Sequence, residues 1–166
     1  MHSNPPGHLE SLPPAAQRLV QTFGFYGYTE DQILRARAAY YGLITYLDDK
    51  IGRLLDTLDQ QGLAQNTVVI YTSDHGESLG DHGLIEKGCR FYEGLVRVPL
   101  IISWPQRFAK NKQSDALVEM LDLSATLLDL AGVEEPDYLQ GISLRPILSG
   151  EADGKDHREF VRCEYF

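Results

Sequence analysis

Two short apolar runs constrain the fold of this chain more than any other feature of its sequence. They are TVVIYT at residues 67–72 and VPLIIS at residues 98–103. Both are rich in β-branched residues, are too short for helices and are apolar on both faces, which is typical of buried strands. Pro99 has no N–H to donate to a sheet, so we expect it at the start of the second strand.

Helical periodicity predicts a long helix over residues 30–61. Thr29 and Gln32 have the spacing of a capping box, and Gly62 is expected to end the helix in the left-handed conformation. One apolar stripe runs along the predicted helix, made of Ile33, Tyr40, Ile44, Leu47, Ile51, Leu54 and Leu58.

The remaining segments give weaker patterns. Residues 1–28 are rich in proline and glycine and are predicted to form an irregular arm, with room for a short helix near 15–22. A second apolar helix is expected over 122–131, closed by Gly132, and a strand is expected over 160–166.

Composition excludes several classes of protein. With 43% hydrophobic and 23% charged residues the chain can pack a core, and its net charge of −9 argues against nucleic acid as a partner. No apolar run approaches the ~18 residues of a membrane span, so no membrane partner is expected. The two cysteines, Cys89 and Cys163, form no disulfide framework or zinc spacing, and we expect both to be inert.

The loop after the first strand carries the candidate chemistry. Its sequence, SDHGESLGDHG at residues 73–83, begins where a strand ends, and ligands of open α/β sheets bind at that edge. Asp74 offers an oxygen ligand and His75 a nitrogen ligand, which together suit a divalent metal. Lys87 can supply a positive charge to a tetrahedral oxyanion.

Plainer interpretations exist for the same residues. On residue types alone, an Asp–His pair at a strand end is more often a solvated turn than a metal site. His82 repeats the Asp-His-Gly pattern and is either such a turn or a support behind the metal ligands. Asp48 and Asp49 are interpreted as solvated surface, and His157 lies in turn-like surroundings and is given no role.

Taken together, these motifs resemble the sulfatases of the alkaline phosphatase superfamily. The resemblance rests on VVIYTSDHGESLGDHG at 68–83, Lys87, FYEG at 91–94, and RVPLII at 97–102 followed by Trp-Pro. It extends over roughly residues 30–150. It implies an α/β fold, an alkaline-phosphatase-like sheet flanked by helices, with residues 29–166 forming the C-terminal part of the catalytic domain.

The resemblance also implies residue roles. Asp74 and His75 match metal ligands, and Lys87 matches the lysine that contacts the transferred sulfate group. The family metal is usually Ca²⁺, and because histidine is less typical of calcium, Mn²⁺ remains open. Glu93 and Arg97 match positions that hold the loop against the sheet.

One family element is not found at either cysteine. Sulfatases attack with a formylglycine made from Cys or Ser in a Cys/Ser-x-Pro-x-Arg segment. Neither Cys89 nor Cys163 is followed by that proline and arginine, and we expect no serine of the chain to be followed by them either. We therefore expect the nucleophile to lie outside this chain. The expected substrate is a small-molecule or carbohydrate sulfate ester. The chain alone is predicted to be inactive, to bind metal weakly and to self-associate.

The same motifs are compatible with other enzymes of the superfamily and with a protein that is not an enzyme. A phosphonate monoester hydrolase shares the lysine at position 87, and a phosphate monoester hydrolase of the same superfamily is a related alternative. A two-zinc phosphoethanolamine transferase has a metal-binding histidine there, so Lys87 disfavours it. The third alternative is a catalytically inactive, truncated binding domain.

Overall fold

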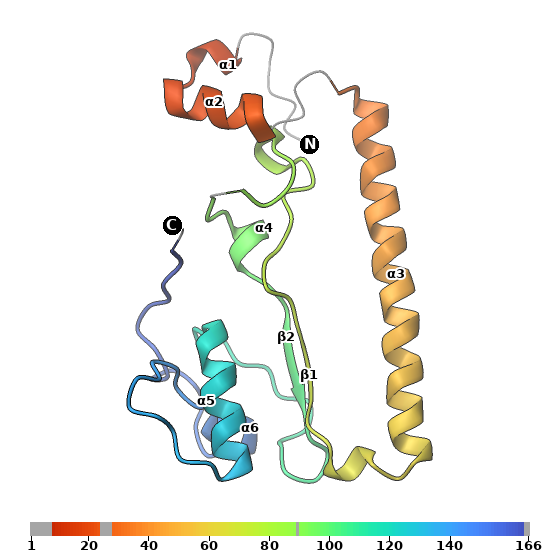
Figure 1. Ribbon diagram of the computed structural model, residues 1–166, viewed down its shortest axis with the longest axis vertical. Coiled ribbons are helices and arrows are strands. Elements are labelled where there is room, and N and C mark those ends of the chain that lie inside the picture. Colours follow the sequence, from red (N-terminus) through yellow and green to blue (C-terminus); the bar gives the residue numbers. More distant parts are fainter. Residues whose placement is uncertain (1–7, 24–27, 89, 165–166) are drawn as a thin grey trace. The chain divides into compact units, whose positions relative to one another are not determined.

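The computed structural model describes residues 8–23, 28–88 and 90–164. The chain divides into two compact units. Figure 1 labels the helices and strands that belong to them. The first consists of Met1–Thr57 and His75–Pro99, and the second consists of Leu58–Asp74 and Leu100–Phe166. The two units therefore interleave along the sequence.

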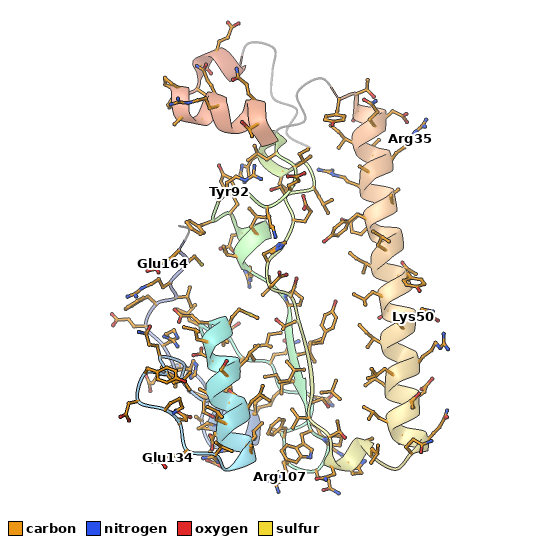
Figure 2. All side chains as sticks on the ribbon, viewed as in Figure 1. Arg35, Lys50, Tyr92, Arg107, Glu134 and Glu164 are labelled. Atoms are coloured by element: carbon orange, nitrogen blue, oxygen red, sulfur yellow. The ribbon has the colours of Figure 1, made fainter. Side chains whose placement is uncertain are left out.

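Most of helix α3, Glu30–Gln60, belongs to the first unit, and its last three residues belong to the second. The predicted capping box is confirmed: the Thr29 N–H donates to Gln32 Oε1 at 2.8 Å and the Gln32 N–H donates to Thr29 Oγ1 at 3.3 Å. Gly62 has the expected left-handed conformation, with φ 68°. None of the helix residues is buried, and Figure 2 shows Arg35 and Lys50 projecting from it.

The arm expected to be irregular contains two helices. They are α1, His8–Ser11, and α2, Pro14–Phe23, and the second covers the short helix foreseen near 15–22. Proline suits the first position of α2 because its missing N–H would have no partner there. Residues 1–7 and 24–27 of the predicted arm lie outside the described residues.

A two-stranded antiparallel sheet lies in the second unit. Strand β1, Val69–Thr72, pairs with β2, Leu100–Ser103, which begins directly after Pro99 as predicted. The expectation of buried strands is wrong for the described residues: β1 is half-buried and Ile101 of β2 is 60% exposed. The reason is that the sheet has two strands here, so its apolar faces are only partly covered.

Helices α5, Met120–Ala131, and α6, Arg145–Ser149, complete the second unit. Gly132 ends α5 in the left-handed conformation, as expected, and Ala125 and Leu144 are buried. The strand expected at 160–166 is absent from residues 160–164, and residues 165–166 lie outside the described part. There the backbone bonds to a side chain instead of a strand, because the Arg162 N–H donates to Glu119 Oε1 at 2.7 Å.

No helix of the described residues combines the length and the apolar character needed to cross a bilayer.

Candidate functional site

The segment that follows β1 passes from one unit to the other. Asp74 is the last residue of its segment of the second unit, and its side chain is exposed. His75 begins a segment of the first unit and is half-buried. The two expected metal ligands are thus neighbours in sequence that belong to different units.

His75 and Lys87 contact each other directly. Lys87 Nζ lies 2.7 Å from His75 Nε2, and His75 Nδ1 lies 2.8 Å from the carbonyl oxygen of Gly76. A carbonyl can only accept, so Nδ1 carries the proton and Nε2 accepts a hydrogen bond from the lysine ammonium. The fold thus brings a predicted metal ligand and the predicted sulfate-contacting residue together, although they are 12 positions apart.

Gly76 fixes the start of this loop. Its N–H donates to the Leu95 carbonyl at 2.8 Å, and a Cβ at this position would lie 1.9 Å from the carbonyl oxygen of Gly94. Only glycine allows that approach to α4, Glu93–Val96. The glycine of the Asp-His-Gly motif therefore anchors the loop beside α4, independently of any ligand.

His82 has a different set of contacts. It has a positive φ of 57° within the short 3₁₀ turn Asp81–Gly83 and stacks on the Tyr92 ring, with centroids 4.1 Å apart. Its proposed role behind the metal ligands stays a prediction. The Arg97–Glu93 pair spans 3.6 Å between side chains that are 83% and 80% exposed, and such exposed pairs stabilise little.

The metal site expected at Asp74 and His75 needs further donor side chains beside these two residues. Among the described residues no group of three or more His, Cys, Asp or Glu side chains is placed to hold an ion. The Nε2 atom of His75, which a metal would need, is hydrogen-bonded to Lys87. Ca²⁺ takes about six to eight oxygen ligands. The described residues of this chain therefore do not form a metal site by themselves.

A serine of this chain meets the spacing of the nucleophile motif. Residues 103–107 read SWPQR, so Ser103 is followed by both the proline and the arginine, and the expectation that no serine fits the motif is wrong. In the structure this stretch is a turn after β2. The Arg107 guanidinium lies 4.5 Å from the ring centroid of Trp104, whose Nε1 donates to the Gln65 carbonyl at 3.0 Å. The contacts of Trp104 and Arg107 thus give these two residues a role in packing the turn.

The second unit contains a buried charged cluster that the sequence did not reveal. Asp122 is fully buried and lies at the start of α5. His157, which was given no role, has a 5% exposed side chain with Nε2 3.3 Å from Asp122 Oδ2, and Arg158 also bonds to this carboxylate. Burial raises the pKa of Asp122, but hydrogen bonds outweigh it and hold the pKa below its usual value; they come from the backbone N–H of Glu119 and of Ile142, from Arg158 and from His157.

Comparison with solved structures defines the class of fold. A phosphonate monoester hydrolase from Silicibacter pomeroyi superposes with a TM-score of 0.74 at 35% identity, covering 91% of this chain and 29% of that one. A sulfatase from Bacteroides thetaiotaomicron superposes with a TM-score of 0.70 at 30% identity, covering 77% of this chain and 28% of that one. The chain is thus part of an alkaline-phosphatase-like α/β fold.

Sequence comparison identifies the family within that class. The family model described as Sulfatase matches residues 1–133, and an arylsulfatase of Clostridium perfringens is 40% identical over 134 residues, which is 79% of this chain and 27% of that protein. A choline-sulfatase of Rhizobium meliloti is 36% identical over 86% of this chain and 28% of its own length. This chain belongs to the sulfatase family. It spans about a quarter of the length of these relatives.

Proposed function

We propose that this chain forms the sulfate-contacting part of a sulfatase that hydrolyses sulfate esters with a formylglycine nucleophile lying outside residues 1–166. The observation that carries the proposal is the 2.7 Å contact between Lys87 and His75, within the stretch matched by the Sulfatase family model. That contact places the Lys87 ammonium beside the His75 imidazole, in the loop after β1.

Lys87 supplies the electrostatic part of the reaction in this proposal. A fixed ammonium near the sulfate oxygens stabilises the negative charge of the group during its transfer. His75 orients that ammonium, because its Nε2 accepts from Lys87 while Nδ1 is held by the Gly76 carbonyl. These are tasks that the residues of this chain can perform without the nucleophile.

Asp74 and His75 are also proposed as contributors to a divalent metal site completed by other residues. To bind the ion, His75 Nε2 would have to release the Lys87 ammonium, because Nδ1 is held by the Gly76 carbonyl. Ca²⁺ is the first candidate and Mn²⁺ the second, and the ion would neutralise sulfate oxygens. Since no third His, Cys, Asp or Glu side chain is placed with these two among the described residues, calorimetry with Ca²⁺ should show weak or no binding to the 166-residue protein. A tight, stoichiometric site would contradict this part of the proposal.

The proposal is tested by separating sulfate binding from turnover. The purified chain should not hydrolyse a chromogenic aryl sulfate. It should bind inorganic sulfate, with the largest change in the NMR signals of isotopically labelled lysines at Lys87, and Lys87→Ala should remove most of the affinity. Lys155→Ala is the matched control, because that side chain is 84% exposed and pairs only at the surface with Asp153.

Two outcomes would contradict the proposal. Hydrolysis by the isolated chain would show that the nucleophile lies within it, and Ser103 would then be the residue to inspect by mass spectrometry for the loss of two hydrogen atoms. Unchanged sulfate affinity in Lys87→Ala would remove the lysine from its assigned role.

The natural substrate is proposed only at the level of its chemistry. Relatives include the choline-sulfatase and an N-acetylglucosamine-6-O-sulfatase of Bacteroides thetaiotaomicron, which is 41% identical over 76% of this chain. A small-molecule or carbohydrate sulfate ester fits both.

A second candidate is a phosphonate monoester hydrolase, favoured by the superposition on the Silicibacter pomeroyi enzyme. Competition between inorganic sulfate and methylphosphonate at Lys87 discriminates the two, since the enzyme's own anion should bind tighter. The upstream coding sequence separates both enzymes from an inactive binding domain, because an open reading frame with Cys-x-Pro-x-Arg supports catalysis.

A further inference from the structure

Arg90 is a buried arginine that lies on the loop of Lys87. The residue is only 7% exposed. Its Nε donates to the Lys87 carbonyl at 3.0 Å, and its Nη2 donates to the carbonyls of Ile85 and Glu86 at 2.8 and 2.9 Å. One guanidinium therefore binds three consecutive backbone carbonyls, including that of the lysine itself. The planar fork of arginine presents its donors in a fixed geometry and so can hold all three carbonyls together.

The loop needs such support because its backbone follows neither a helix nor a strand at this point. Glu86 has a φ of 59° and Gly88 has a φ of 51°, so left-handed residues flank Lys87 on both sides. A Cβ on Gly88 would lie 3.1 to 3.2 Å from the Arg90 guanidinium, so the glycine makes room for the arginine. From the other side, Ser78 Oγ donates to the Glu86 carbonyl at 2.6 Å.

We propose that Arg90 is a positioning residue for Lys87: by holding the carbonyls of residues 85–87 it fixes the backbone from which the lysine reaches His75 and the sulfate group. This inference rests on the proposed function of Lys87. Arg90 acts through the loop and does not touch the anion. Its loss should therefore release Lys87 from its position without removing the charge that binds sulfate.

The first test measures the order of Lys87 without any ligand. In the 166-residue protein, the Lys87 amine is labelled by an acylating reagent and the rate is followed on its peptide by mass spectrometry. Arg90→Gln should raise the rate at Lys87 about 5-fold, which corresponds to the loss of about one net hydrogen bond. The rate at Lys155 should not change. Arg35→Gln is the control, because Arg35 is an exposed arginine of the same unit whose side chain pairs with Asp31 on α3.

The second test measures inorganic sulfate affinity in a double-variant cycle. Arg90→Gln should raise the sulfate Kd about 5-fold. In a Lys87→Ala background the same substitution should add nothing, because a residue that acts only through Lys87 has no effect once the lysine is gone. A merely structural role would instead lower affinity equally in both backgrounds.

The outcomes separate this inference from the proposed function. If Lys87→Ala leaves sulfate binding intact, the proposed function fails, and the labelling rate still decides whether Arg90 positions the lysine. An unchanged Lys87 rate in folded Arg90→Gln overturns the inference, as does an additive double variant. If Arg90→Gln does not fold, Arg90→Lys is used; it keeps the charge and loses the fork, so its Lys87 rate should also rise.

Discussion

Asp122 is the residue whose ionisation matters most to the second unit. It is completely buried, yet its pKa lies below the usual value because charged and backbone donors surround it. The carboxylate joins the start of α5 to the Ile142 N–H at 2.8 Å and to the segment of His157 and Arg158. A buried carboxylate that keeps its charge in this way stabilises the fold through its partners.

The free energy of unfolding should therefore depend on pH in the acid range. The unfolded chain protonates Asp122 at a higher pH than the folded chain does, so stability is full above about pH 4 and falls as the pH drops through the lower pKa of the folded state. Urea unfolding followed by the fluorescence of Trp104, the single tryptophan, measures this from about pH 3 to about pH 7.

Asp122→Asn is the matched variant. It should cost about 3 kcal/mol at neutral pH, because the amide leaves buried donors without a charged acceptor, and it should flatten most of the acid dependence. Some dependence should remain from Asp129, whose pKa is also lowered, first by the Ser143 hydroxyl and then by Arg145. A wild-type stability that does not change in acid would contradict the role given to Asp122.

Two glycines of the first unit should respond oppositely to alanine. Gly76→Ala should destabilise the loop by more than about 2 kcal/mol, since the added Cβ would overlap the Gly94 carbonyl. Gly42→Ala, in the middle of α3 with nothing within 4 Å of the added Cβ, should stabilise by about 0.5–1 kcal/mol. Thermal unfolding of both variants provides the comparison, and equal shifts would show that Gly76 is not held by its close contact.

The candidate site could be predicted from the sequence only where its residues form a local motif. Asp74, His75 and Lys87 were singled out from one short stretch, and the structure places the last two in contact. Asp122 was missed because its partners are distant in sequence. Arg90 was missed although its partners are local, because they belong to an irregular loop whose conformation no periodic pattern predicts. The link from Asp122 to Arg158, for example, joins residues 36 positions apart.

At the scale of elements, the start of α3 should depend on its cap. Thr29→Ala removes the hydroxyl that accepts from the Gln32 N–H, and this should cost about 1 kcal/mol and fray the first turn. Hydrogen exchange of the α3 amides measures the effect. Thr45→Ala is the control, because its hydroxyl bonds only to the Tyr41 carbonyl inside the helix. Equal protection of the first turn in both variants would rule out the cap.

The elements themselves were largely predictable, whereas their partners were not. Capping residues and periodicity placed the ends of α3 within one residue and those of α5 within two, because these signals are local. Apolar runs located β1 and β2 but suggested burial on both faces. The structure pairs the two strands only with each other in its described part and leaves Ile101 mostly exposed. Burial depends on which segments cover a face, and a single run cannot specify that.

At the scale of the whole molecule, the exposed apolar surface of α3 should cause self-association. The large apolar side chains on α3 that are more than a third exposed are Leu34, Tyr40, Tyr41, Leu43, Ile44, Tyr46, Leu47, Leu54 and Leu55. Apolar patches of this kind favour association, and the net charge of −9 opposes it weakly because charges are screened beyond ~8 Å.

Sedimentation velocity over a range of concentrations tests the association. Leu47→Glu should shift the protein toward monomer, whereas Thr45→Glu adds the same charge outside the apolar stripe and should change little. A monodisperse monomer of the unmodified chain at every concentration would contradict the prediction.

The central claim is that this chain carries the sulfate-contacting part of a sulfatase, and a chimera tests it most directly. Residues 30–133 would replace the aligned stretch of the Clostridium perfringens arylsulfatase, which supplies the remaining three quarters of the enzyme. The folded chimera should hydrolyse an aryl sulfate, and Lys87→Ala within it should lower kcat/KM by at least about 100-fold, as expected for the loss of a charge on the transferred group. A folded chimera without hydrolysis, or one that keeps its rate after Lys87→Ala, would contradict the claim.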